Sequence, residues 1–241
     1  MTLAMASYAQ TTATYRDANG DILTCTAKVI PDQPNSLQGW YVVPGDIEIN
    51  IENPSVCFNL TGDTHIILGD GCTLTINYRQ GDATNIGIIG SGKNLTIYGG
   101  DKGTGKLVIR NPYFGTYCIR TSSLTVNGGT LDIEWAAAMV GVVQTSNFTI
   151  NGGTVIVKLL KQSSDGIVEE AAGGLCMGSS NYYINGGSLY ATQYKSTGNV
   201  VFGKAFCAGS TLITANTKIW LAGPYTLQQL AHTTRLQCPN T

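Results

Sequence analysis

The chain has 241 residues, which is long enough for one large domain with a full hydrophobic core. Charged residues make up only 12% of it and the net charge is −1, which argues against a nucleic-acid-binding surface. No apolar run approaches the ~18 residues of a membrane span, and the 30 glycines against 7 prolines indicate many tight turns rather than disorder.

The N-terminus carries a weak export signal. The first ten residues, MTLAMASYAQ, place Ser7-Tyr8-Ala9 before Gln10, which resembles the small-x-small site of signal-peptide cleavage. A charged start is missing and the apolar stretch is short, so an ordinary disordered leader is the alternative. We expect residues 1–39 to be a leader or signal remnant followed by a cap, and the protein to be exported.

A repeated unit fills the middle of the chain. The stretch LTVNGGTLDI spans residues 124–133, and FTINGGTVIV spans residues 148–157, 24 positions later. Apolar and polar residues alternate on both sides of Gly-Gly, which predicts two short strands joined by a tight turn. Weaker copies extend from about Tyr41 to Leu221, and a third short apolar segment precedes most of them.

This periodicity predicts the fold class. Three short strands per unit, at periods of 24 to 34 residues, describe the coils of a parallel β-helix. A single coil cannot bury its own apolar face, whereas stacked coils bury a continuous core. We therefore predict an all-β chain with a right-handed parallel β-helix of about seven coils over residues 40–223 and a C-terminal cap or tail over 224–241.

Asparagine recurs at one turn of the predicted coils. Asn127, Asn151 and Asn185 fall at the same position of three successive units. Stacked asparagines can hydrogen-bond to one another along a solenoid and satisfy turn backbone groups. The Asn-Gly-Gly motif is therefore expected to be architectural.

Several longer stretches carry a family resemblance. GWYVVPGDIEI, THIILGDGCTLT and GSGKNLTIYGGDKGTGKLVI, followed by the NGGT coils, resemble a broad group of secreted β-helix proteins of gut and other anaerobic bacteria. Proteins of that group are described as carbohydrate-binding-domain-containing, so the resemblance implies a β-helix, export and carbohydrate binding. Similar β-helices also occur in pectate lyases, glycoside hydrolases and phage tailspikes, so the fold alone does not identify the function.

Outward-facing residues are the candidates for function, and the alternation assigns them. If Leu131 and Ile133 point inward, then Asp132 and Glu134 point outward. Opposite charges on neighbouring coils, such as Arg110 and Glu134, are expected to pair and to stabilise the sheet modestly. Aligning the second strands predicts one outward column of Glu48, Thr75, Val108, Asp132, Ile156, Tyr190 and Trp220, and another of Asn50, Asn77, Arg110, Glu134, Lys158, Thr192 and Ala222.

Three aromatic residues suggest a sugar platform. Tyr190 and Trp220 are predicted to be outward neighbours on adjacent coils, and Tyr183 is predicted to face outward on the first strand of its coil. An exposed aromatic ring offers a sugar an apolar face, and an exposed apolar patch usually has a partner. The candidate carbohydrate site comprises these aromatic residues with Asp132, Glu134 and Arg110. Alternatively, the C-terminal tail covers the aromatic residues as a cap.

Two other function classes stay open. Asp132 and Glu134 are spaced for a glycoside hydrolase, or for a calcium-dependent lyase acting on acidic polysaccharide. Arg110 and Lys158 would lower the carboxylate pKa values and repel a cation, and the seven cysteines form no zinc pattern, so we expect no cofactor unless calcium serves this alternative. Thr96, Thr125 and Thr149 line up in register as in some ice-binding β-helices, although strand propensity explains them more simply.

The sequence therefore predicts a secreted or cell-surface module that binds a polysaccharide or a host or bacterial glycan, or acts as an adhesin, without catalysis. The alternative is a polysaccharide lyase or glycoside hydrolase. What separates them is whether three or more acidic side chains gather in a groove on one sheet.

Overall fold

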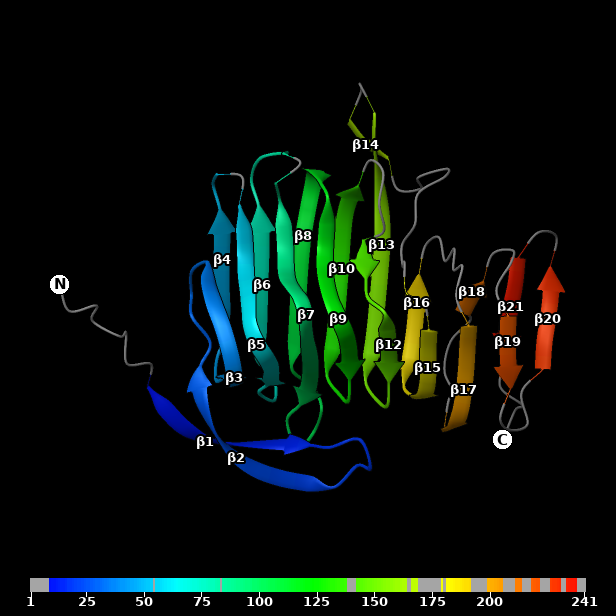
Figure 1. Ribbon diagram of the computed structural model, residues 1–241, viewed down its shortest axis with the longest axis horizontal. Helices are drawn as coiled ribbons and strands as arrows, with labels where there is room; N and C mark the ends of the chain where they lie inside the picture. Colours follow the sequence, from blue (N-terminus) through cyan, green and yellow to red (C-terminus); the bar gives the residue numbers. More distant parts are fainter. Residues whose placement is uncertain are drawn as a thin grey trace.

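The computed structural model describes residues 9–53, 55–82, 84–137, 142–163, 166–168, 179, 181–191, 199–205, 211–213, 218–221, 226–230 and 233–237. This part of the chain is all-β, without a helix, and forms a parallel β-solenoid of about four turns (Figure 1). None of it is a helix with the length and hydrophobicity needed to cross a membrane. The strands are β1 (Gln10–Arg16), β2 (Ile22–Val29), β3 (Asn35–Val43), β4 (Ile47–Ile51), β5 (Val56–Leu68), β6 (Thr73–Tyr78), β7 (Ile86–Gly99), β8 (Lys106–Gly115), β9 (Tyr117–Val126), β10 (Thr130–Ala137), β11 (Val143–Gln144), β12 (Asn147–Ile150), β13 (Thr154–Ser163), β14 (Gly166–Val168), β15 (Asn181–Gly186), β16 (Ser188–Ala191), β17 (Asn199–Ala205), β18 (Thr211–Ile213), β19 (Lys218–Leu221), β20 (Thr226–Leu230) and β21 (Thr233–Gln237).

The strands form three sheets. Sheet A has the order β1-β2-β3-β5-β7-β9-β12-β15-β17-β19, with β11 also beside β9. Sheet B has the order β14-β13-β10-β8-β6-β4, with β16 also beside β13. The chain alternates between sheets A and B and stacks each strand parallel to its counterpart in the previous coil, as in β5 on β3 and β6 on β4. The third sheet, β18-β21-β20, is antiparallel.

The period-2 alternation of the sequence produces the core. In β6, for example, Leu74, Ile76 and Tyr78 are buried, whereas the threonines and asparagine between them are half-exposed. Register stacks inward residues of successive coils on one another, and each buried Ile or Val stabilises the fold by roughly 1.5–3 kcal/mol. One such inward stack in sheet B runs through Ile49, Ile76, Ile109, Ile133 and Val157, each at most 2% exposed.

The prediction of seven coils with three separate strands is not confirmed at that level of detail. The predicted first and third segments run together as one long strand in β5, β7 and β9. The pairing of β5 with β7 shifts register between Asn59 and Thr64, and that of β7 with β9 shifts between Gly90 and Asn94. Each shift marks a bend, so the coil turns a corner without leaving the sheet.

A hairpin that the repeat pattern did not lead us to expect precedes the solenoid. Strands β1 and β2 pair antiparallel through seven residue pairs, from Gln10 with Lys28 to Arg16 with Ile22. Only Lys28 and Val29 of the hairpin pair with β3. The hairpin runs below the lower turns of the first coils, across the strands rather than along them (Figure 1).

The predicted outward register is confirmed in sheet B for most of its length. The first column pairs in the order Glu48, Thr75, Val108, Asp132, Ile156 and Tyr190, and the second pairs from Asn50 to Lys158. Thr192 and Ala222 lie outside the described residues.

The prediction is wrong for Trp220. Trp220 lies on β19 in sheet A, where it pairs with Val201, and so it is not a neighbour of Tyr190 on sheet B. The segment before Trp220 explains the difference, because residues 211–213 do not lie in sheet A. Those residues form β18 and pair antiparallel with β21, so β17 and β19 supply the last strands of sheet A instead.

Candidate binding site

Asp132, Glu134 and Arg110 lie together on the outer face of sheet B, as predicted, but they bind one another. Arg110 Nη2 donates to Asp132 Oδ2 at 2.7 Å, and Arg110 Nε lies 3.2 Å from Glu134 Oε2. Lys158 Nζ donates to Glu134 Oε1 at 2.9 Å. Each carboxylate therefore has a cationic partner on the neighbouring strand, which favours a structural charge ladder over a free acid–base pair.

Among the residues that the structure describes, no third acidic side chain joins this ladder to make the cluster that a calcium-dependent lyase would need. Within the described residues, no three His, Cys, Asp or Glu side chains gather closely enough to hold a metal ion. On the outer face of sheet B, Arg110 and Lys158 thus form a network of mutual ion pairs with Asp132 and Glu134.

The three predicted aromatic residues lie on two different sheets. Tyr183 is on β15 in sheet A with 38% of its surface exposed. Val201 pairs with Tyr183 on one side and with Trp220 on the other, so Tyr183 and Trp220 belong to one column, two strands apart. Tyr190 lies in sheet B opposite Ile156. The side chains of Tyr190 and Trp220 fall outside the described part of the chain, so only Tyr183 can be placed as an exposed ring.

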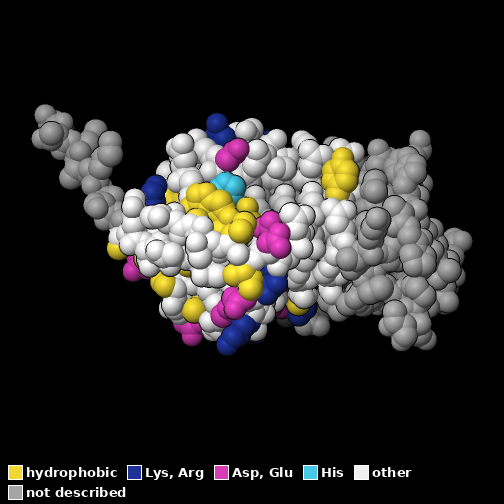
Figure 2. All heavy atoms as spheres, turned by 90° about the horizontal axis from the view of Figure 1, so that it is seen from below, with side chains coloured by type: hydrophobic (Ala, Val, Ile, Leu, Met, Phe, Trp, Pro, Cys, Tyr) yellow, Lys and Arg dark blue, Asp and Glu magenta, His cyan; other side chains and the backbone are white. Residues whose placement is uncertain are grey.

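A different aromatic cluster, of Tyr15, Trp40, His65 and Tyr98, lies where the hairpin crosses sheet A. The rings of Trp40 and His65 stack with centroids 4.3 Å apart and planes 15° apart. Tyr15, from the hairpin, packs against Trp40 and Tyr98 at 5.0 and 4.8 Å. Figure 2 shows hydrophobic side chains gathered beside the histidine on this face. The cluster anchors the hairpin to the outside of the solenoid.

Burial in the cluster shifts the pKa values of His65 and Tyr98. Burial lowers the pKa of His65, against the opposing effect of Asp63, and the His65 Nδ1 atom lies 3.5 Å from the Tyr98 hydroxyl. Burial raises the pKa of Tyr98 to about 12. Both groups are therefore held in their neutral forms at neutral pH, which suits an apolar contact between hairpin and sheet.

A groove of about 490 Å³ opens where the hairpin ends. Its floor is the row of Asn-Gly-Gly turns, and its wall is the tip of the hairpin with part of the turn after β7. The lining residues are Arg16, Asp17, Ala18, Asn19, Gly20, Lys102, Gly103, Asn127, Gly128, Gly129, Asn151, Gly152, Gly153 and Asn185.

The asparagines on the floor form an amide ladder of Asn127, Asn151 and Asn185. Asn151 Nδ2 donates to Asn127 Oδ1 at 2.8 Å, and Asn185 Nδ2 donates to Asn151 Oδ1 at 2.8 Å. This confirms the stacking expected from the sequence. Each amide still has a second N–H and a second oxygen lone pair, so the ladder presents fixed donors and acceptors at the ~4.8 Å spacing of a parallel sheet.

Glycine keeps this floor flat. Gly129, Gly153 and Gly187 have φ values of 74°, 78° and 74°, in the left-handed region that glycine adopts without strain. A Cβ atom on Gly153 would collide with the carbonyl oxygen of Gly129, one coil away, and one on Gly187 would collide with that of Gly153. The turns can therefore stack only as glycines at these positions. Gly152 and Gly153 are half-exposed in the groove, whereas Gly128 and Gly129 are buried.

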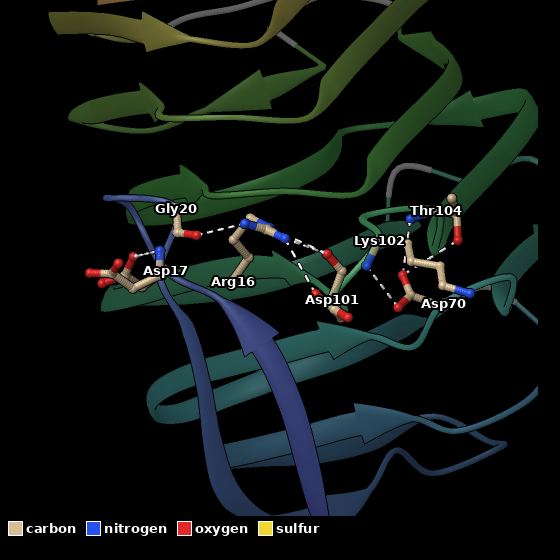
Figure 3. Close-up of polar contacts among 8 residues, drawn as sticks. Arg16, Asp17, Gly20, Asp70, Asp101, Lys102 and Thr104 are labelled. Carbon is tan, nitrogen blue, oxygen red and sulfur yellow. Dashed lines mark hydrogen bonds and ion pairs between the residues drawn. The ribbon is translucent and has the colours of Figure 1, made fainter.

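Ion pairing and hydrogen bonds hold the wall together (Figure 3). Arg16 donates to the carbonyl oxygen of Gly20 at 2.7 Å and to that of Asp101 at 2.8 Å, and it lies 3.3 Å from the Asp101 carboxylate. Asp70, from the preceding turn, accepts from the backbone N–H groups of Lys102 and Thr104 at 2.9 and 3.2 Å. These contacts tie the hairpin tip to residues 101–104, although 85 positions separate Arg16 from Asp101.

The groove was not predicted from the sequence because the hairpin was not predicted. A signal was present: residues 10–29 alternate on both sides of Asp17-Ala18-Asn19-Gly20, a combination typical of a hairpin turn. The floor was identified through Asn127, Asn151 and Asn185, but as architecture and not as a surface.

Comparison with protein-family models, with curated proteins and with solved structures finds no match for this chain. The geometry of the groove is therefore the basis for assigning a function.

Proposed function

We propose that the protein is an exported, non-catalytic β-solenoid module that binds a neutral polysaccharide, as a carbohydrate-binding or adhesive domain of the cell surface or medium. The observation that carries this proposal is the groove of about 490 Å³ along the amide ladder. The proposal takes the solenoid as right-handed, with the seven coils that the sequence repeat predicts.

The chemistry of the groove supports a neutral sugar. The primary amides of the ladder offer both donors and acceptors, which is what sugar hydroxyl groups require. The ladder carries no charge. At the wall, Arg16 is paired with Asp101, and Asp17 and Lys102 add one charge of each sign to the lining. Between the hairpin and the isolated hydrophobic patch at the right, the surface in Figure 2 is largely white, the colour of uncharged polar side chains and of the backbone.

The dimensions of the floor suit an extended sugar chain. The amides repeat along the solenoid axis at ~4.8 Å, close to the advance of one hexose in an extended β-linked glycan. Successive sugars can therefore meet equivalent amides. We expect the affinity to be micromolar or poorer, because each such contact replaces hydrogen bonds to water and has a small net energy.

The lyase or hydrolase alternative gains no support from the described residues. Asp132 is paired with Arg110, Glu134 is paired with Arg110 and Lys158, and neither acidic residue lines the groove. Release of reducing ends or of unsaturated uronides from any polysaccharide by the purified protein would contradict the non-catalytic part of the proposal.

Affinity electrophoresis in gels that contain neutral polysaccharides tests the proposal, with xyloglucan, galactomannan, xylan and mixed-linkage β-glucan as probes. Retardation in at least one gel is expected, and Asn151→Ala should weaken the binding about tenfold. The matched control is Asn77→Ala on sheet B, which also loses a cross-strand amide contact, to Glu48, but lies outside the groove.

The control separates binding from stability. Both substitutions remove hydrogen bonds worth ~0.5–1.5 kcal/mol each, so their melting temperatures should fall by similar small amounts. Equal loss of retardation in both variants would mean that the amide ladder acts only through stability. Migration of the wild-type protein unaffected by every gel, and by acidic pectin and alginate, would remove the carbohydrate proposal.

A further inference from the structure

The amide ladder does not run the length of the solenoid. Asn127 follows Val126, which pairs with Ile97 of the preceding coil, so the position next to Asn127 along the axis is Tyr98. The same column continues through Ile67 and Val42, since Tyr98 pairs with Ile67 and Ile67 with Val42. The column therefore changes from polar to apolar between Asn127 and Tyr98.

The hairpin covers the apolar part of that column. Ala13 and Ala27 of the hairpin form a buried cluster with Val42, Ile67 and Tyr98 on the outside of the sheet. These residues are at most 9% exposed. No ligand can lie on the column there without displacing the hairpin.

The hairpin tip and the loop after β7 form a wall at the point where the hairpin stops covering the column. The turn after β7 is longer than the Asn-Gly-Gly turns of the next coils, because residues 100–105 separate Gly99 from Lys106. Arg16 joins this loop to the hairpin tip, and Asp70 holds the loop from the turn before it. Figure 3 shows Arg16 between Gly20 and Asp101, with Asp70 beside Lys102 and Thr104. Two segments that lie far apart in the sequence, the hairpin tip and the loop of residues 100–105, thus close the same end of the groove.

We infer that the groove is blind at the hairpin and binds the end of a neutral, extended polysaccharide chain rather than its middle. The inference rests on the proposed function. A chain that lies along Asn185, Asn151 and Asn127 meets Arg16 and residues 17–20 at its next sugar. Only a terminal sugar fits there, and its extra hydroxyl group can accept from the guanidinium or donate to the wall carbonyls.

End binding makes a quantitative prediction that binding along a chain does not. A linear polysaccharide has one end of each kind whatever its length, so one protein should bind per chain at every length. Binding along the chain would instead give a number of bound proteins that grows with length. Isothermal titration of the wild-type protein into two mixed-linkage β-glucan fractions of very different mean length, or into such fractions of another unbranched polysaccharide that retards it, measures this stoichiometry.

A stoichiometry of one protein per chain for both fractions supports the inference, and a stoichiometry that rises with chain length overturns it. The second result leaves the proposed function intact if Asn151→Ala still weakens binding. Absence of binding to any fraction and to every gel counts against both, whereas the stoichiometry separates them whenever binding occurs.

A variant at the wall gives an independent test. Ala18→Leu adds bulk at the closed end of the groove, and we expect it to weaken binding of both fractions about tenfold. Thr12→Leu is the matched control, because Thr12 is an exposed residue of the same hairpin that does not line the groove. Unchanged affinity in Ala18→Leu, with the melting temperature also unchanged, would show that chains do not reach the wall and would overturn the inference.

Discussion

The outer face of sheet A has two regions: the hairpin covers one of them and leaves the other exposed. In the first coils, Val42, Ile67 and Tyr98 face outward from the solenoid and are nevertheless buried beneath the hairpin. In the later coils, the same column continues as Asn127 and Asn151, which are half-exposed and line the groove. The two regions share one column of the strand register, but Val42, Ile67 and Tyr98 are strand residues whereas Asn127 and Asn151 lie in turns.

This difference shows that outward and exposed are separate properties in a solenoid. Alternation fixes which way a side chain points relative to the core of the coils. Whether an outward residue meets water depends on what another segment lays across the sheet. The side-chain chemistry changes at the coil where the hairpin ends, as expected if the covered coils serve stability and the open coils serve binding.

A charged substitution in each region gives the strongest test of whether the hairpin covers one region and leaves the other exposed. Ile67→Asp should destabilise the protein by at least ~4 kcal/mol, because it buries an unpaired carboxylate beneath the hairpin. Thr125→Asp, on the open part of the same sheet, should cost no more than ~1 kcal/mol. Urea denaturation curves of the two variants measure the difference, and equal costs would mean that the hairpin does not cover Ile67 in solution.

Truncation of an aromatic residue in each region should give the next largest effect. Tyr98→Ala removes a ring packed against Tyr15 and Trp40 and should cost ~3 kcal/mol or more. Tyr183→Ala should change the stability by less than ~0.5 kcal/mol, because 38% of Tyr183 is exposed beyond the hairpin. Thermal melting of both variants tests this. A large loss of stability in Tyr183→Ala would mean that another segment of the chain covers the Tyr183 ring.

Release of the hairpin tip should change the free energy of unfolding only slightly but should clearly increase local opening of the hairpin. Arg16→Ala removes the link to Asp101, an exposed pair whose loss should cost ~1 kcal/mol or less. The hairpin should open more often and expose Cys25, whose thiol is half-buried and has a pKa raised by burial. Peptide-resolved thiol labelling should show faster modification of Cys25, whereas Cys72, outside the hairpin, should label at the wild-type rate.

The smallest expected effect is a dependence on pH from His65. Burial lowers its pKa in the folded protein, so the unfolded chain, with the ordinary value of 6.5, takes up the proton first as the pH falls. His65 therefore contributes stability above pH 6.5 that is lost progressively below it. The melting temperature of wild type should fall between about pH 7 and pH 5 more than that of His65→Phe. Parallel curves for the two proteins would show that His65 titrates normally in the fold.

Local repetition in the sequence predicted much of the fold. The inward stack, the outward columns of sheet B and the pairing of Arg110 with Glu134 follow from alternation and from the spacing of Gly-Gly turns. The same repeat predicted the ladder of Asn127, Asn151 and Asn185. Where the repeat fades, after β16, the prediction was wrong for Trp220, because a short strand carries no information about which sheet it joins.

The site depended on contacts that no local pattern encodes. Tyr15 meets Tyr98, and Arg16 meets Asp101, across more than eighty residues of chain. A hairpin turn can be inferred from residues 17–20, but the coil over which the hairpin lies depends on the apolar column that it buries.

The sequence by itself determined that the chain winds into stacked parallel coils, which turns stack as asparagine and glycine, and which side chains face outward. The tertiary structure alone decided which outward side chains are covered and where the groove ends. The physical reason is that strand pairing and turn geometry repeat with the local sequence, whereas the docking of the hairpin occurs once, through apolar burial and a single arginine between segments far apart in the chain.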